Sequence, residues 1–357
     1  MKTLFITSFH THISRNILYS DLLTLLKKDF KIVVLAPDYK KKYFEDNFVG
    51  EGVVVEGIKP YQSSKNAIGL FFKNLAIYLL DSDTTKIKRW FKLHQGKYPH
   101  YFFYTAAAWV GKSFLIRKLF RALDFAFYKN GFFADLINRY NPAIVFSTDI
   151  QNENDVLLAH DARRVGVPVL GMVRSWDNLS QRVFRAWPDE LLVGAEIIKT
   201  EAVDFHQYPG ERIVITGYPY YDRYLRTASV LRRDSKESFF QELGLDPNKK
   251  LILYAPIGDP IVSKNDIDRH VIGLLGKVDA NILVRLPTNL NLNLEGFKLP
   301  FNVVVDRPGF KFGEKRSDTG FLDNEITKSD DDRLVDSLYY SDLVIAGPTS
   351  ICLDAIL

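Results

Sequence analysis

Apolar runs of strand length alternate with helical patterns along most of the chain, and this alternation most constrains its fold. TLFITSF at 3–9 is the first strand-like run, and KIVVLAP at 31–37 is the second. Between them, the apolar residues of 17–26 recur at helical spacing. Strand, helix and strand in close succession predict a parallel βαβ unit with a right-handed crossover.

The alternation continues in two series that a charged, turn-prone stretch around 222–233 separates. The further strand-like runs lie at 142–149, 167–173, 189–195, 212–217, 250–256, 280–287, 301–306 and 341–347. We therefore predict an α/β fold with two Rossmann-like domains that face a cleft. Ligands of such sheets bind at the carboxyl ends of the strands.

The domain prediction is a first domain over 1–225 and a second over 226–357. A helical insertion interrupts the first domain at about 60–135. The second domain is shorter and stops inside an expected helix, in the sequence SICLDAIL, so we expect a truncated second domain whose activity is impaired.

The insertion is rich in basic and aromatic residues. Eleven lysines and arginines lie between 67 and 133, against three aspartates, and phenylalanines, tyrosines and tryptophans are interleaved with them. This combination suits an anionic membrane surface, where apolar burial and attraction to lipid head groups add. The alternative is that the aromatic residues form a core and the lysines a solvated face.

Composition and charge restrict the classes of protein to which the chain can belong. The single cysteine, Cys352, excludes an internal disulfide framework and suits a reducing, cytoplasmic setting. No apolar stretch is long enough for a transmembrane helix, so a membrane location would be peripheral, on the inner face of the cell membrane. A net charge of +4 is mild for 357 residues, and we expect no nucleic-acid partner.

The last strand ends in a small-residue turn that opens a helix. Pro348, Thr349 and Ser350 would present backbone N–H groups and hydroxyls to a phosphate, and Asp354 could reach a sugar hydroxyl. The alternative is an ordinary helix capped by Thr349 or Ser350.

Two other strand ends of the second domain are expected at the same edge. Pro256 and Gly258 form a turn where a ligand could approach the backbone, and Arg285 is a permanent cation suited to a diphosphate. Gly258 could instead only turn the chain, and Arg285 could pair with a carboxylate. Together with the last turn, these residues predict a nucleotide-diphosphate pocket.

In the first domain, candidate bases follow two strands. His10 and His12 lie in the loop after the first strand, and histidine titrates near neutral pH. Asp149 ends the strand IVFSTD on the same edge and is a rival general base. Either histidine could instead be solvated or structural.

A third loop of the first domain combines side chains that grip sugars or phosphates. It begins after the strand at 167–173 and holds, in order, Arg174, Ser175, Trp176, Asp177 and Asn178. We expect it to bind the acceptor. Alternatively, Trp176 fills a core while Asp177 and Asn178 make a turn.

Several of these stretches resemble a known family. VITGYPYYD, SDLVIAGPTSICLDA and the SWDN stretch look like the two-Rossmann-domain (GT-B type) glycosyltransferases. The nearest relatives suggested are bacterial surface-polysaccharide and CDP-glycerol glycerophosphotransferase-like proteins, with a more distant similarity to UDP-N-acetylglucosamine 2-epimerases. The resemblance implies that Pro348, Thr349, Ser350 and Asp354 hold the donor's diphosphate and ribose, and that the loop with His10 and His12 faces the acceptor.

Two departures from these families matter. Glycerophosphotransferase-like proteins have a histidine before the proline where this chain has Arg285-Leu286-Pro287. Epimerases have an acidic, glycine-rich run where this chain has Gly-Pro-Thr-Ser.

The function expected from the sequence is transfer of a sugar from a nucleotide-activated donor to a hydroxyl acceptor in cell-surface polysaccharide or glycolipid biosynthesis. The acceptor would be a glycan or lipid-linked. The alternatives are a sugar-nucleotide epimerase of the same fold, a glycerophosphotransferase-like enzyme, and a non-catalytic nucleotide-sugar-binding module. We expect no metal and no cofactor besides the nucleotide-sugar substrate, because helix dipoles and basic residues neutralise the leaving diphosphate in this fold.

Overall fold

The chain forms two compact units, as a computed structural model shows. It describes residues 1–128, 131–226, 235–258, 267–290, 292–313, 323–347 and 349–357. Unit 1 comprises residues 1–13 and 22–218, and unit 2 comprises residues 14–21 and 219–357. Residues 14–21, which the sequence analysis assigned to the first domain, thus group with the second unit.

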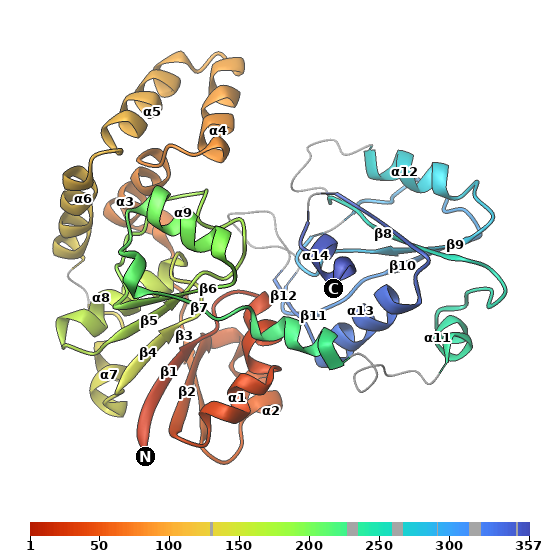
Figure 1. The fold of residues 1–357 in the computed structure, drawn as a ribbon, viewed down its shortest axis with the longest axis horizontal. Helices are drawn as coiled ribbons and strands as arrows, with labels where there is room; N and C mark the ends of the chain where they lie inside the picture. The colour runs from red at the N-terminus through yellow and green to blue at the C-terminus, as the bar shows by residue number, and fades with distance from the viewer. Residues whose placement is uncertain (129–130, 227–234, 259–266, 291, 314–322, 348) are drawn as a thin grey trace. The chain divides into compact units, whose positions relative to one another are not determined.

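Unit 1 is built on a seven-stranded parallel sheet with the order β3-β2-β1-β4-β5-β6-β7 (Figure 1). Its strands are β1 Lys2–Thr7, β2 Phe30–Pro37, β3 Val53–Ile58, β4 Ile144–Ser147, β5 Val169–Met172, β6 Glu190–Val193 and β7 Ile213–Ile215. The predicted parallel α/β architecture is confirmed, and β3 is a strand that the sequence analysis did not expect. The strand order reverses direction between β1 and β4, which leaves a crevice site at the carboxyl ends of these two strands.

The helices of unit 1 bury the apolar faces of this sheet. Outside the insertion they are α1 Asp21–Leu26, α2 Lys41–Phe48, α7 Ala134–Tyr140, α8 Glu153–Arg164 and α9 Glu196–His206. Phe5, Val33 and Leu35 on the central strands are fully buried, as strands covered on both faces require.

Four helices occupy most of the insertion, and we call them the helical arm (residues 67–127). They are α3 Ala67–Tyr78, α4 Asp83–His94, α5 Tyr98–Val110 and α6 Phe114–Phe127. Ser82 caps α4 with a reciprocal capping box that includes Thr85. Gly111 ends α5 against Leu79, where an added Cβ would lie 2.1 Å from the Leu79 carbonyl oxygen. No described helix of the chain is long and apolar enough to cross a bilayer.

Unit 2 contains a four-stranded parallel sheet with the order β10-β9-β8-β13 and a small antiparallel pair. The strands are β8 Leu251–Ala255, β9 Asn281–Arg285, β10 Val303–Asp306, β11 Phe310–Lys311, β12 Asn324–Glu325 and β13 Leu343–Ala346. The helices are α11 Lys236–Leu243, α12 Ile267–Leu275, α13 Lys328–Tyr340 and α14 Ile351–Ile356. Gly244 ends α11 at a φ of +67°, a left-handed conformation that glycine adopts without strain.

Residues 14–21 join unit 2 through polar and aromatic contacts. Their first turn, Ser14–Leu18, lies against the short helical segment Pro219–Arg226. The Ser14 hydroxyl donates to Glu325 Oε2 at 2.7 Å, and the Arg15 guanidinium lies 3.9 Å from the ring centre of Tyr220.

Candidate functional site

The carboxyl ends of β8 and β13 form the switch point of the sheet in unit 2. The two strands are adjacent and parallel, with Ala255 opposite Ala346, so the loops that follow them begin side by side. A Cβ added to Gly347 would lie 2.9 Å from Ile257 Cγ1, which shows that the two loops are in contact. Pro256, Gly258, Thr349 and Ser350 are therefore brought together, as the sequence predicted from strand ends alone.

The loop after β8 is held by a buried carboxylate. Asp268 in the first turn of α12 accepts from the backbone N–H of Ile257 at 3.2 Å and of Gly258 at 3.0 Å. Its other donor is the Tyr254 hydroxyl at 2.5 Å. Gly258 has a φ of +87°, which only glycine tolerates well. These amides bind Asp268, so Pro256 and Gly258 shape the edge while the hydrogen-bond donors for a ligand come from β13.

The turn after β13 offers hydroxyls that do not cap the helix. Ser350 precedes α14 without a side-chain capping bond, and the buried Thr349 Oγ1 has no hydrogen-bond partner among the described residues. The alternative drawn from the sequence, a helix capped by the Thr349 or Ser350 side chain, is therefore not formed. Pro348, which the sequence also assigned to this site, lies outside the described residues.

Arg285 lies inside unit 2 instead of reaching toward this edge. Its guanidinium pairs with Asp306, the residue opposite it on β10, and donates to the Asp330 carbonyl oxygen at 2.6 Å. Only 6% of Arg285 is exposed. The contacts correspond to the carboxylate-paired alternative and not to a cation directed at a diphosphate.

Asp354 is also buried, in a cluster that the sequence analysis missed. The Tyr224 hydroxyl donates to Asp354 Oδ1 at 3.1 Å, and the Tyr220 hydroxyl lies 2.7 Å from that of Tyr224. Burial raises the pKa of the Asp354 carboxyl, and the nearby Arg15 opposes this rise. The sequence analysis used the stretch VITGYPYYD only for its resemblance to a family. The hydrogen bond from Tyr224 to Asp354 joins residues more than a hundred positions apart, so no local pattern reveals it.

In unit 1 the switch point lies between β1 and β4, where hydroxyls surround a buried acid. Thr7 donates to Asp155 Oδ1 at 2.6 Å and Ser147 donates to the same oxygen at 2.8 Å. Thr148 donates to the Thr7 carbonyl oxygen at 2.8 Å and ties the two strand ends together. Burial, with Asp149 adding to it, raises the pKa of Asp155 to about 7. The sequence analysis did not single out Asp155.

His10 and His12 lie beside this edge, in the loop after β1. The His12 backbone N–H donates to His10 Nδ1 at 3.2 Å, and the two ring centres are 5.2 Å apart. Nδ1 of a neutral His10 accepts this bond. In this state His10 carries its ring hydrogen on Nε2.

Asp149 and Arg174 form an ion pair across two neighbouring strand ends. Arg174 Nε lies 2.9 Å from Asp149 Oδ2, and both side chains are largely buried. The sequence analysis expected both residues at this edge, with Asp149 as a candidate general base and Arg174 as an acceptor-binding residue. The ion pair makes Asp149 a partner that orients Arg174.

The loop between β5 and β6 carries the remaining acceptor candidates. Trp176 is exposed, and Asp177 Oδ2 accepts from Gln181 Nε2 at 3.0 Å. Asn178 is buried, and its Oδ1 has no hydrogen-bond partner within the described part of the chain. Ser175 contributes a backbone turn, because its carbonyl oxygen accepts from the Asn178 N–H at 3.2 Å. The exposed Trp176 does not fill a core.

A buried histidine fixes this loop to the unit. His206 Nε2 lies 2.9 Å from the Leu179 carbonyl oxygen, and its Nδ1 accepts from the Phe184 N–H at 3.3 Å. This pattern requires a neutral ring, and burial lowers the pKa of His206 to about 3. Among the described residues, no cluster of three or more histidine, cysteine or acidic side chains could hold a metal ion.

Comparison with known proteins adds evidence on the fold. No protein-family model matches the sequence, and no curated protein matches it. The UDP-GlcNAc 2-epimerase from Methanocaldococcus jannaschii superposes with a TM-score of 0.52 at 12% identity, over 99% of this chain and 81% of the epimerase. The UDP co-structure of MnaA from S. aureus gives 0.51 at 13% identity, over 98% of this chain and 75% of that chain.

The fold is of the GT-B type. This confirms the resemblance stated from the sequence and the prediction of Rossmann-like units. Identities this low show the fold alone. A glycosyltransferase from Rickettsia africae also matches, at 10% identity over 96% of this chain and 72% of its own, but its TM-score of 0.46 carries no argument.

Proposed function

We propose that this GT-B-type chain is a nucleotide-sugar enzyme, and within that class a glycosyltransferase. The observation that carries the proposal is the pair of hydroxyls of Thr349 and Ser350 at the switch point of unit 2. Neither hydroxyl is used as a helix cap. A buried hydroxyl without a partner costs stability, and a ligand oxygen placed there would satisfy it.

The ligand that best fits this turn is the diphosphate of a nucleotide sugar. Phosphate oxygens accept several hydrogen bonds at once, and hydroxyls at a strand-to-helix turn are suitable donors. The two structures reported above with TM-scores of 0.52 and 0.51 are named for a UDP-sugar and for a UDP complex, which supports a UDP-type donor for this chain.

Unit 1 supplies groups suited to the acceptor. The acceptor's hydroxyl oxygen would attack the anomeric carbon, whose bond to the phosphate oxygen breaks. The nucleoside diphosphate leaves with the electron pair. The hydroxyl proton passes to His12, while Arg174, held by Asp149, and the exposed Trp176 would bind the acceptor's sugar or phosphate groups.

The acceptor we propose is a glycan or a lipid-linked saccharide of the cell surface, assembled at the cytoplasmic side of the membrane. The basic and aromatic helical arm supports a lipid-linked acceptor. Neither a cofactor nor a metal enters the proposed step.

Binding of nucleotides to the full chain tests the donor site. Isothermal titration with UDP, CDP, GDP and UDP-GlcNAc should give one preferred base. Thr349→Val and Ser350→Ala should each weaken that Kd about 10- to 100-fold, the range for losing a hydrogen bond to a charged group. Thr200→Val is the matched control, because Thr200 is exposed on α9 and bonds only its own helix backbone. Unchanged affinity in both variants would refute the assignment of this turn.

An epimerase is the second candidate function, because the enzyme from Methanocaldococcus jannaschii that superposes with a TM-score of 0.52 is named as a UDP-GlcNAc 2-epimerase. The two reactions differ in what they release. Epimerisation inverts C2 of the sugar with no acceptor, and the products keep the nucleotide attached. Transfer releases free nucleoside diphosphate only when an acceptor is present. Incubation with UDP-GlcNAc alone, followed by ¹H NMR of the anomeric protons, separates these outcomes. Binding without epimerisation in this incubation, and without release of nucleoside diphosphate when a glycan or lipid-linked acceptor is added, would indicate a non-catalytic module.

A further inference from the structure

Helix α6 exposes an apolar stripe although it also has a buried face. The buried face holds Phe120 and the charged Arg117 and Asp124, which are 4%, 4% and 2% exposed. Its leucines at 115, 119 and 123 are 71%, 54% and 42% exposed and lie four residues apart on one stripe. A helix of a globular protein normally turns its apolar stripe to the core. No described part of unit 1 covers this stripe.

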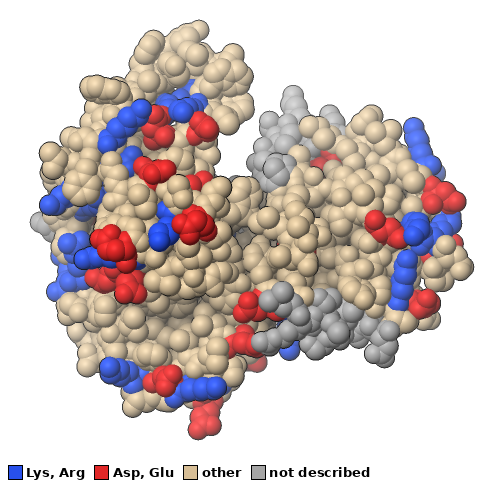
Figure 2. Space-filling model, in the orientation of Figure 1, with Lys and Arg blue, Asp and Glu red and all other residues tan. Residues whose placement is uncertain are grey.

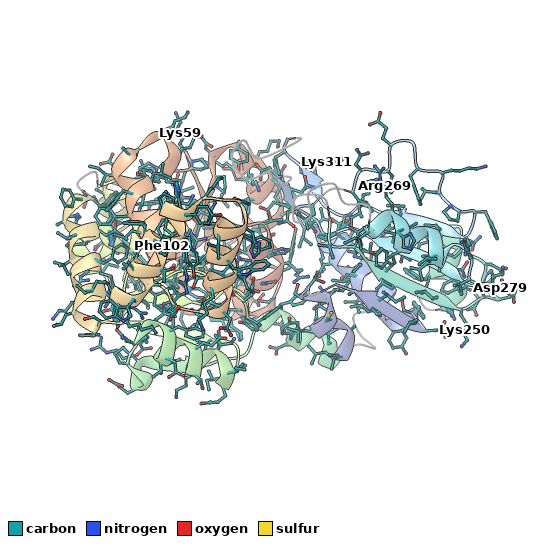
Figure 3. All side chains as sticks on the ribbon, turned by 90° about the horizontal axis from the view of Figure 1, so that it is seen from above. Lys59, Phe102, Lys250, Arg269, Asp279 and Lys311 are labelled. Carbon is teal, nitrogen blue, oxygen red and sulfur yellow. The ribbon has the colours of Figure 1, made fainter. Side chains whose placement is uncertain are left out.

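The other helices of the arm also expose large apolar side chains. Phe71 projects from α3, Trp90 and Phe91 from α4, and Phe102, Phe103 and Trp109 from α5; of these, Trp109 is 74% exposed. Figure 2 shows that the outer tip of unit 1 at α4 and α5 is tan, with blue and red groups below it, and Figure 3 looks down on this end and labels Phe102. An apolar patch of this extent marks a contact surface.

The arm also carries the positive charge of the chain. Residues 67–127 hold ten of the 47 lysines and arginines but only three of the 43 acidic residues. All three acids are paired: Asp81 with Arg89 and Lys112, Asp83 with Lys86, and Asp124 with Arg185. The rest of the chain is slightly acidic, so the net positive charge of the protein comes from this arm, although Arg89 and Arg117 within it are buried.

A cationic pocket opens beside the stripe of α6. It has a volume of about 390 Å³ and is lined by α6, α8 and the loop before β6, with Lys118, Arg121 and Arg163 among its walls. Arg121 lies 4.1 Å from the ring centre of Trp187, and burial lowers the pKa of its guanidinium to about 10. Among described residues, no carboxylate forms an ion pair with these three cations. The pocket therefore favours an anion.

We propose that the helical arm docks on an anionic lipid bilayer, with the α6 stripe in the membrane interface and a lipid phosphate in the pocket. Apolar burial and charge attraction then act on the same surface. A second copy of the chain fits this surface poorly, because it would bring an equally basic arm against it. The proposal is independent of the reaction that the chain catalyses.

Co-sedimentation of the full chain with vesicles tests the proposal. Binding should be at least about tenfold stronger to vesicles of phosphatidylcholine with phosphatidylglycerol than to phosphatidylcholine alone, and should weaken with salt. Lys118→Glu and Arg163→Glu should remove the preference for anionic lipid. Leu115→Ser and Leu119→Ser should each weaken binding to the anionic vesicles about tenfold, since each removes a leucine side chain that the bound membrane would bury.

Matched controls lie outside the arm. Lys277→Glu changes an exposed lysine of unit 2, and Ile197→Ser changes an exposed apolar residue of α9. Both should bind vesicles as the parent does, and thermal melting should show that all variants fold. Equal binding to both lipid compositions, or none, would overturn the proposal. Two further results would overturn it. In the first, millimolar inorganic phosphate displaces the protein from vesicles while Leu119→Ser does not weaken vesicle binding. In the second, sedimentation velocity shows a dimer that Leu119→Ser dissociates.

Discussion

At the residue scale, burial and hydrogen bonds together set the protonation of single buried side chains. His206 is held neutral because one ring nitrogen accepts a backbone N–H and the other donates to a carbonyl. Asp155 shows the opposite preference: it retains a proton to about pH 7 because burial penalises its charge. Both sit next to loops that carry candidate site residues.

The pH dependence of stability should reveal His206. Below the ordinary histidine pKa of about 6.5, His206 of the unfolded chain binds a proton, whereas His206 of the folded chain does so only near pH 3. The contribution of His206 to stability is therefore complete above pH 6.5 and is lost as the pH falls, by up to about 1.4 kcal/mol per pH unit.

Comparison with a variant isolates this effect, since Asp155 shifts stability in the opposite direction between about pH 4 and 7. His206→Gln should destabilise the protein by about 1–3 kcal/mol at pH 7.5, from its lost hydrogen bonds and packing. The difference from the parent should shrink toward pH 5 in urea titrations. A constant difference across this range would contradict a neutral buried ring.

At the scale of elements, α6 is attached to unit 1 by a buried ion pair in addition to the apolar packing of Phe120. Arg185 binds Asp124 through two nitrogens, at 2.8 and 2.9 Å, and donates to Glu153 as well. The buried pair holds the pKa of the Asp124 carboxyl below its usual range. This explains how a helix with an exposed leucine stripe stays in place.

Removing one partner of this pair should be costly. Asp124→Asn leaves part of the Arg185 charge uncompensated in the interior and should lower the free energy of unfolding by about 3 kcal/mol or more. Asp83→Asn is the control, because Asp83 pairs with Lys86 at the exposed surface of α4, and should cost less than about 1 kcal/mol. Similar losses in chemical denaturation would mean that the Asp124 pair is not buried in solution.

The strands could be predicted from the sequence, but several side-chain roles could not. Apolar runs identify β1, β2, β4 and β8 because buried parallel strands are continuously apolar. β3 has the sequence VVVEGI and interrupts this pattern. Arg285 could not be assigned without knowing that β10 lies beside β9 and places Asp306 opposite it. Asp354 likewise depends on Tyr224, far along the chain.

Some residues of the candidate site could likewise be predicted from the sequence, and others could not. The rule that ligands bind at the carboxyl ends of parallel strands predicts the place of the site, and this rule selects Thr349, Ser350, His10 and Asp149 as candidates. The buried Asp155 and the clustering of Arg15 with Tyr220 depend on tertiary contacts that no local pattern reports.

At the scale of the whole molecule, each unit has a core of its own. Phe5, Val33 and Leu158 belong to one, and Phe239 and Leu253 to a core of unit 2. A unit with its own core can unfold cooperatively by itself. We expect two calorimetric transitions, of which Leu253→Ala lowers one and Val33→Ala the other.

The nucleotide that binds best should raise only the transition that Leu253→Ala lowers, because the proposed donor turn lies in unit 2. A single transition shifted by both variants would contradict independent cores. A rise in the other transition would instead move the donor site to unit 1.

The short segment 14–21 has a consequence for any attempt to exchange these units between proteins. Because this segment completes unit 2 from a position near the chain's start, unit 2 is discontinuous in sequence. A chimera joined only at 218/219 would give unit 2 a foreign first turn, without the Arg15 guanidinium on Tyr220 or the Ser14 hydroxyl on Glu325. Recombination between relatives should therefore succeed when both stretches are inherited from the same parent, because residues 14–21 and 219–357 form one structural unit.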